Sequence, residues 1–111
     1  MKSSWRDQAI EIYDRFLRLA HAKGSLKSDP EITHYLALAI CGEAGELANL
    51  VKKRWRGDEV NLAQIRDELA DIRIYLEHLC RLLHVDLDAA CQIKLNEVAS
   101  RLAAKEIAGA G

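Results

Sequence analysis

Two pairs of acidic residues have a spacing that suits metal chemistry. Glu43 and Glu46 are three residues apart in an apolar stretch of the sequence. Glu68 and Asp71 repeat that spacing in a second apolar stretch. On a helix, two residues at this spacing project from the same face, so each pair forms one acidic surface. Carboxylates embedded in apolar sequence do not lie on a plainly solvated face, which makes these four candidate ligands for a cation.

Helical periodicity indicates the elements that must position these side chains. Apolar residues recur at three- and four-residue steps in four segments, at about residues 4–22, 30–56, 61–84 and 87–107. Pro30 suits a helix start, and Asp86 suits the N-cap of the last helix. Asn61 and Gln64 have the spacing of a capping box. The sequence therefore predicts an all-α fold in a single domain: a four-helix bundle-like subunit with antiparallel neighbours, ending in a frayed tail at 108–111.

Antiparallel packing of the second and third predicted helices would bring the two acidic pairs together. Glu46 lies ten residues before Arg56, near the end of one helix, and Glu68 lies seven residues after Asn61. These offsets place the pairs at similar heights. Two unit charges about 5 Å apart repel by roughly 3 kcal/mol at an effective dielectric constant of 20. A small domain is stable by only about 5–15 kcal/mol, so such a cluster needs protons, basic partners or a metal.

The chemistry of the donor atoms narrows the choice of metal. Oxygen-only ligands select a hard cation such as Mg²⁺ or Mn²⁺, and Mg²⁺ also binds phosphate oxygens. Acidic pairs at this spacing are nevertheless common on solvated helix edges. Glu11 and Asp14 have the same spacing, and no site is assigned to them. Spacing alone therefore leaves a metal site and a solvated acidic edge both open.

Composition excludes several other classes of function. The formal net charge is −1, so the chain has no general basic field for a nucleic acid polymer. No run of about 18 apolar residues predicts a membrane span, and the first residues contain no apolar segment typical of a signal peptide. The three cysteines form no CxxC pair, which favours free thiols in a reducing cytoplasm.

These segments resemble the MazG-type all-α nucleoside triphosphate pyrophosphohydrolases. The family pattern is ExxE, a spacer and then ExxD, and the two acidic pairs match it in that order. A later segment, Lys94-Leu95-Asn96, resembles the KFN-type motif on the last helix of the family, with leucine where an aromatic residue is common. The resemblance covers roughly residues 35 to 101.

The resemblance implies a Mg²⁺-dependent enzyme, with Mn²⁺ as a substitute, that cleaves a nucleoside triphosphate between its α- and β-phosphates. All four carboxylates would hold the metal, and Glu46 would also orient or deprotonate the attacking water. Further residues would contact the nucleotide: Lys53, Tyr75, Lys94, Asn96 and Arg101. Trp55 either stacks on a base or packs at a helix end.

Two wider expectations follow from the sequence. The apolar stripes of the second and third helices are too broad for a lone small bundle, so part of that surface is expected to be buried in a dimer. The family resemblance extends this expectation to a homodimer or a homotetramer. It also implies a cytoplasmic protein that acts in nucleotide metabolism or in the removal of unwanted nucleotides (housecleaning). The alternative is a helical interaction module that binds a metal or a nucleotide without turnover.

Overall fold

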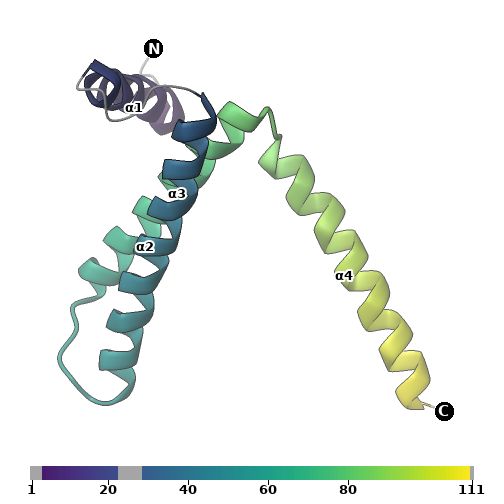
Figure 1. Cartoon of the computed structure of the whole chain (residues 1–111). Coiled ribbons are helices and arrows are strands. Elements are labelled where there is room, and N and C mark those ends of the chain that lie inside the picture. Colours follow the sequence, from purple (N-terminus) through teal and green to yellow (C-terminus); the bar gives the residue numbers. More distant parts are fainter. Residues whose placement is uncertain (1–3, 23–28, 111) are drawn as a thin grey trace.

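The computed structural model describes residues 4–22 and 29–110, and it contains four helices and no strand in that part of the chain (Figure 1). Their bounds are α1 (Trp5–Ala22), α2 (Asp29–Trp55), α3 (Leu62–Leu83) and α4 (Leu87–Ala110). The all-α class and the number of helices predicted from periodicity are confirmed. The last helix continues to Ala110, three residues beyond the end at Ile107 that the sequence indicates.

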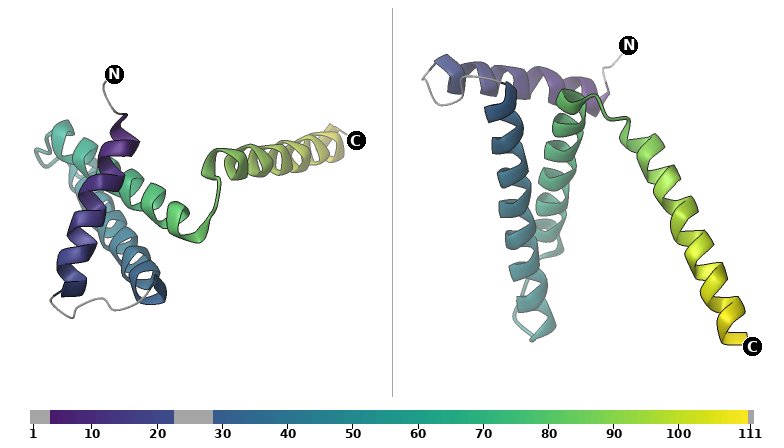
Figure 2. Two further views of the ribbon diagram at one scale, coloured as in Figure 1. Left: turned by 90° about the horizontal axis from the view of Figure 1, so that it is seen from above. Right: turned by 45° about the vertical axis from the view of Figure 1, so that its right-hand side comes forward.

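The α2–α3 hairpin is the longest packed unit, with the two helices antiparallel and side by side (Figures 1 and 2). The predicted capping box begins α3. The Asn61 side chain accepts a hydrogen bond from the Ala63 N–H at 2.8 Å, and Gln64 Oε1 accepts one from the Asn61 N–H at 3.2 Å. Gly57 has a φ of 96°, a left-handed conformation that favours glycine, and it lets the chain leave α2. Local signals therefore fix both ends of the turn.

The small core lies where α1 crosses the opposite end of the hairpin (Figure 2). Among the described residues, the first three helices each contribute one buried side chain: Leu17 of α1, Leu36 of α2 and His78 of α3. Two ion pairs join α1 to α3: Asp14 lies 2.8 Å from Arg81, and Arg6 lies 3.4 Å from Glu77. A buried histidine is thus part of the core that holds α1 in place.

The last helix leaves the other three, which differs from the packed bundle that the sequence predicts. Figures 1 and 2 show α4 extending away from the hairpin, and none of its described residues is buried. The left-handed backbone of His84, with φ 57°, turns the chain before α4. Asp86 then caps α4 as predicted, accepting a hydrogen bond from the Ala89 N–H at 3.1 Å. The radius of gyration is 18.6 Å, against roughly 13 Å for a compact domain of this length.

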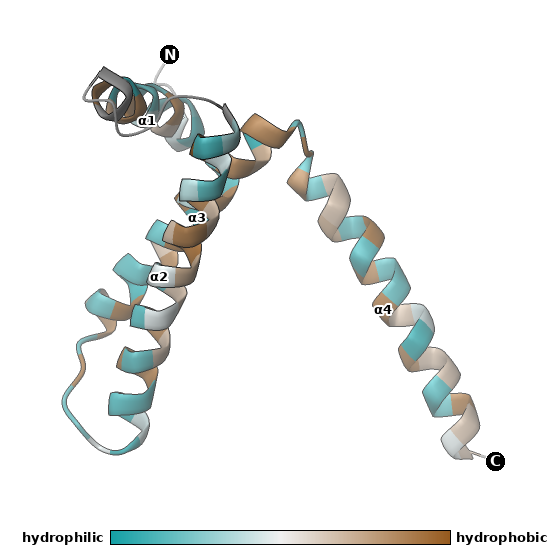
Figure 3. Cartoon of the chain, in the orientation of Figure 1, coloured by the Kyte–Doolittle hydropathy of each residue, from teal (hydrophilic) through white to brown (hydrophobic). Residues whose placement is uncertain are grey.

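Exposed apolar residues follow from that departure. Figure 3 shows hydrophobic positions along α4, and none of the α4 residues that the structure describes is buried. One stripe repeats at three- and four-residue steps and consists of Leu87, Cys91, Leu95, Val98 and Leu102, and we call this set the α4 stripe.

Among the described helices, none combines the length and the apolar character that a membrane span needs.

We predict that the protein loses stability as the pH falls below 6.5. Burial, and then the charge of Arg81, lower the pKa of His78 from its ordinary value of 6.5, while Asp14 acts in the opposite direction. Below pH 6.5 the unfolded chain therefore binds a proton that the folded protein resists, and the stability present above that pH is progressively lost. Thermal unfolding above and below pH 6.5 measures the effect.

The variant His78→Phe should show a smaller loss than the wild type, because it removes the buried titrating ring. His34→Phe is the control, since His34 is exposed on α2. An unchanged acid dependence in His78→Phe would refute this explanation.

Candidate metal centre

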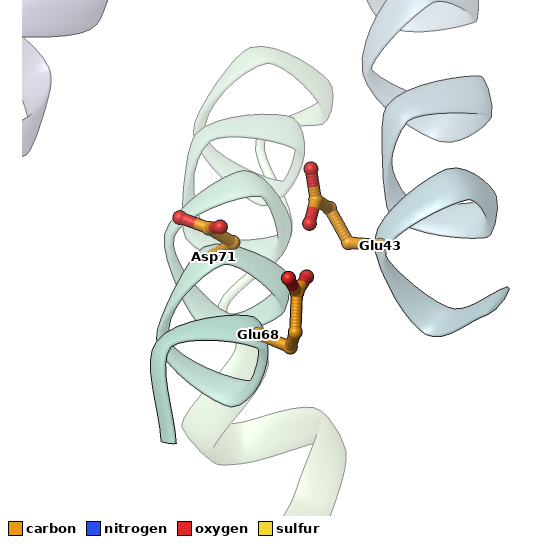
Figure 4. Close-up of side chains that lie close together, drawn as sticks. All are labelled: Glu43, Glu68 and Asp71. Atoms are coloured by element: carbon orange, nitrogen blue, oxygen red, sulfur yellow. The ribbon is translucent and has the colours of Figure 1, made fainter. Parts of the chain in front are cut away.

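Three carboxylates converge between α2 and α3 (Figure 4). Glu43 comes from α2, and Glu68 and Asp71 come from α3. One oxygen from each lies within 4.8 Å of the others, and all three residues are half-buried. The antiparallel packing of α2 and α3 therefore brings Glu43 of the first acidic pair together with both residues of the second pair. Three acidic oxygens from two helices form a site that a hard cation could occupy.

The fourth carboxylate lies at the edge of this cluster. Glu46 is exposed on α2 and does not belong to the group whose oxygens converge. Its charge still reaches Glu68, because it is one of the groups that raise the pKa of that residue. Three convergent oxygens therefore belong to half-buried residues, while the fourth carboxylate is exposed and still interacts with Glu68.

Glu68 shows the electrostatic cost of the arrangement. A hydrogen bond shared with Glu43, then partial burial, and then the hydrogen bond and charge of Glu46 raise the pKa of Glu68 to about 7. Its Oε2 atom is buried and has no hydrogen-bond partner among the described residues. A buried acceptor without a donor is unusual in a native protein. An unpartnered oxygen among converging carboxylates fits a bound cation.

The Glu11 and Asp14 pair provides an internal comparison. Both residues are paired with arginine: Glu11 lies 2.6 Å from Arg15, and Asp14 lies 2.8 Å from Arg81. In the described part of the chain, no lysine or arginine forms an ion pair with Glu46 or with any of the three convergent carboxylates. The same spacing is therefore paired with arginine in α1, whereas no described basic residue pairs with the carboxylates between α2 and α3.

Aromatic side chains adjoin the cluster on the side of α1. Tyr75 follows Asp71 by one helical turn, and its ring meets that of Tyr13 edge to face at 5.5 Å. Ile12, Tyr13, Phe16 and Tyr75 line a cavity of about 220 Å³, which we call the aromatic recess. Burial first, and then Tyr13, Tyr35, Glu43 and Asp71, raise the pKa of Tyr75 to about 12. Tyr75 therefore remains a neutral phenol near the carboxylates.

Sequence reasoning missed the contribution of α1 to this region. The family resemblance singles out Tyr75, whereas Tyr13 and Phe16 belong to the apolar repeat of the first predicted helix, which assigns them no site. Two aromatic residues at i and i+3 were the available signal. The spacing cannot show which partner they meet, because Tyr13 and Tyr75 are far apart in the sequence.

The other predicted nucleotide contacts lie further from the cluster along the helices. Lys53 is half-buried near the end of α2, and Trp55 ends that helix with 87% of its surface exposed. The remaining three residues lie on α4 and are exposed: Lys94, Asn96 and Arg101. Lys94 lies 3.6 Å from Glu97, and Asn96 accepts a hydrogen bond from Gln92 at 3.0 Å. Since α4 leaves the hairpin, one chain does not bring them to the carboxylates.

Comparison with known proteins gives three relevant similarities. The chain is 35% identical over 82 residues to the gene 37 protein of Mycobacterium phage L5, covering 69% of this chain and 72% of that protein. It is 35% identical over 92 residues to dCTP pyrophosphatase 1 of Rattus norvegicus and 36% identical to that of Bos taurus. Each of these two matches covers 72% of this chain and 53% of the relative, so the chain spans about half the length of the mammalian proteins. No protein-family model matches the sequence.

We predict that Mg²⁺ stabilises the folded protein. A ligand that binds only the folded state at a hundred times its dissociation constant adds about 2.7 kcal/mol, which raises the melting temperature by roughly ten degrees. Glu68→Gln should remove this response. Without metal it should unfold no earlier than the wild type, because it also removes a repelling charge.

Glu11→Gln is the matched control, because it neutralises a glutamate that already has an arginine partner. Melting curves with Mg²⁺ and with a chelator compare the three proteins. If Glu68→Gln keeps the full Mg²⁺ response, the cluster is not the metal site.

Proposed function

We propose that this chain, which belongs to the same protein family as the gene 37 protein of Mycobacterium phage L5, is a nucleoside triphosphate pyrophosphohydrolase. It would cleave a ribo- or deoxyribonucleoside triphosphate between the α- and β-phosphates and release a monophosphate and pyrophosphate. The convergence of Glu43, Glu68 and Asp71 carries the proposal. The similarity to proteins named dCTP pyrophosphatase 1, and the MazG-type motifs, support the reaction class.

The three convergent carboxylates are proposed to hold Mg²⁺, with Mn²⁺ as a substitute. When bound, the cation would neutralise charge on the phosphate oxygens. All the donor atoms are oxygens, which suits a hard cation. The buried Oε2 of Glu68 has no hydrogen-bond partner among the described residues, and a cation would supply the missing interaction. With a pKa of about 7, Glu68 gives up its proton readily at neutral pH when a cation binds.

Glu46 is proposed to act on the attacking water. Its exposure and its place outside the three convergent oxygens leave its carboxylate available for a proton. Water attacks the α-phosphorus, its proton passes to Glu46, and the bond from the α-phosphorus to the bridging oxygen breaks as pyrophosphate leaves. A positioned base of this kind contributes about 10²- to 10⁴-fold to the rate.

Cationic and amide side chains are proposed to bind the phosphates and sugar. They are Lys53 on α2 and Lys94, Asn96 and Arg101 on α4. The α4 residues lie on a helix that leaves its own hairpin, so in this proposal they serve the cluster of another copy. Trp55 is kept as a candidate contact at the end of α2. The enzyme would act in cytoplasmic nucleotide metabolism, including the removal of unwanted nucleotides.

Self-association is proposed because the single chain leaves too much surface uncovered. Its accessible surface is 8542 Å², roughly 2,400 Å² more than the roughly 6,200 Å² typical of a folded monomer of this mass. An obligate homodimer interface buries about 2,000–5,000 Å² in total, so the excess on two chains is of the right size. The α4 stripe is the apolar surface most fully separated from the rest of the fold. A homodimer or homotetramer would cover it.

We predict that Glu46→Gln lowers kcat by about 10²- to 10⁴-fold, because it removes the proposed base. A panel of ribo- and deoxyribonucleoside triphosphates with Mg²⁺ measures pyrophosphate release. The variant should keep its helical circular dichroism and its Mg²⁺-dependent rise in melting temperature. Glu59→Gln, an exposed glutamate in the α2–α3 turn, is the control.

Two results would contradict the proposal. Wild-type turnover by Glu46→Gln would remove Glu46 from the chemistry. No pyrophosphate from any nucleotide with the wild type would favour the alternative, a binding module without turnover.

We also predict that the wild type sediments as a dimer or tetramer at micromolar concentration and that Leu95→Asp shifts it toward monomer. The aspartate would place a charge in the α4 stripe, where burial without a partner is costly. Ile93→Asp is a close control, because Ile93 and Leu95 are 61% and 62% exposed and project from opposite faces of α4. A wild type that stays monomeric at micromolar concentration contradicts the prediction.

A further inference from the structure

Two cysteines lie on either side of the joint between α3 and α4, which consists of residues 84–86. Cys80 is half-buried in the last turn of α3, and Cys91 is exposed near the start of α4. Both are free thiols. Neither takes part in the carboxylate cluster or in the proposed nucleotide contacts, so the joint carries a pair of nucleophilic side chains with no role in that site.

The backbone folds back on Cys80 before α4 begins. The Cys80 carbonyl accepts a hydrogen bond from the Val85 N–H at 2.9 Å, and the left-handed His84 turns the chain between them. A cavity of about 240 Å³ lies at this joint, and its walls include Cys80, Val85 and Leu87. The side chain of Cys80 and the first turn of α4 therefore border the same space.

Helical geometry places Cys91 beside that space as well. Leu87 and Cys91 are four residues apart on α4, so their side chains project from the same face, about 6 Å apart along the helix axis. Since Leu87 lines the cavity, Cys91 lies on the face of α4 that adjoins it. The two thiols also interact, because burial, then Glu77 and then Cys91 raise the pKa of Cys80. The third cysteine, Cys41, lies on α2 and does not line the cavity.

We propose that Cys80 and Cys91 form a reversible intramolecular disulfide that fixes the direction of α4 relative to α3. The oxidant is a low-molecular-weight disulfide such as oxidised glutathione. The exposed Cys91 thiolate attacks one sulfur of the oxidant and displaces the first thiol, and the Cys80 thiolate then attacks the Cys91 sulfur and displaces the second. The protein loses two electrons and two thiol protons, and one molecule of oxidant becomes two molecules of thiol.

The short connection between the cysteines favours an internal bond. Ten residues separate Cys80 from Cys91 in the sequence, so each thiol is present at a high effective concentration for the other. A disulfide holds its two α carbons within about 7 Å. Because one cysteine ends α3 and the other begins α4, such a bond leaves α4 little freedom to turn about the joint.

The bond would also act on the surface that is proposed for self-association. Leu87 and Cys91 are the first two members of the α4 stripe. The disulfide would hold this end of the stripe against α3, where a second copy has less access to it. We therefore expect oxidation to weaken self-association. This consequence rests on the proposed self-association, whereas the bond itself does not.

Intact-mass spectrometry after incubation with oxidised glutathione tests the bond. The wild type should lose the mass of two hydrogen atoms, and a reductant should restore the original mass. Tryptic cleavage after Arg81 separates the two cysteines, so a linked pair of peptides identifies the bond. Cys41→Ser is the matched control, and it should form the same bond.

Cys80→Ser and Cys91→Ser should each abolish the loss of two hydrogen atoms. Cys91→Ser changes an exposed side chain, so it keeps the test decisive if Cys80→Ser fails to fold. Sedimentation of Cys41→Ser, with and without the oxidant, measures the effect on assembly and should show a shift toward monomer on oxidation. The double variant Cys41→Ser, Cys91→Ser should sediment alike under both conditions.

The outcomes separate this inference from the proposed enzyme. Disulfides formed only between chains, or glutathione bound to the cysteines without an internal bond, would overturn it. An internal bond with unchanged sedimentation would support the bond and refute its effect on assembly. None of these measurements uses a nucleotide, so a failure to release pyrophosphate would refute the enzyme alone.

Discussion

The carboxylates between α2 and α3 are the constraint on which the other features depend. Like charges do not gather between two helices unless packing elsewhere holds the helices together. Here that packing comes from the apolar contact of α2 with α3 and from α1 across one end of the hairpin. The raised pKa of Glu68 and its Oε2 atom without a hydrogen-bond partner both show that the clustered negative charges are unfavourable. The fold therefore holds an unfavourable arrangement that a cation would turn into a favourable one.

The crossing of α1 over the hairpin has two consequences. It completes the small core through Leu17, Leu36 and His78, and it places Tyr13 against Tyr75. Arg81 joins these roles, since it pairs with Asp14 and contacts the buried ring of His78. Stability and the wall of the aromatic recess thus depend on the same contacts. A change that loosens α1 should disturb both, which is why conservative variants are needed to separate them.

The features that the sequence predicted are those encoded locally. The Asn61–Gln64 capping box and the Asp86 N-cap depend on residues within one turn of each other. The convergence of Glu43 with Glu68 and Asp71 was also predictable, because a short turn joins α2 to α3 and fixes their register, whereas Glu46 does not join the group as predicted. Contacts of α1 with α3 join residues more than sixty positions apart. An apolar stripe predicts that a helix face is buried, but it does not identify the helix against which that face packs. For the same reason the sequence did not reveal that α4 would leave the bundle.

In the proposed function, the direction of α4 would tie self-association to substrate binding. Burial of the α4 stripe requires a surface that the described helices of this chain do not offer to their own α4. Helical geometry places Lys94, Arg101 and Lys105 along one edge of that stripe. Any copy that covers the stripe therefore acquires a row of cations at its border. The cluster carboxylates have no lysine or arginine ion-pair partner within the described chain, and a triphosphate would add further negative charge. Cations from a neighbouring α4 would meet that need, so an assembly that hides apolar surface would also complete the binding site.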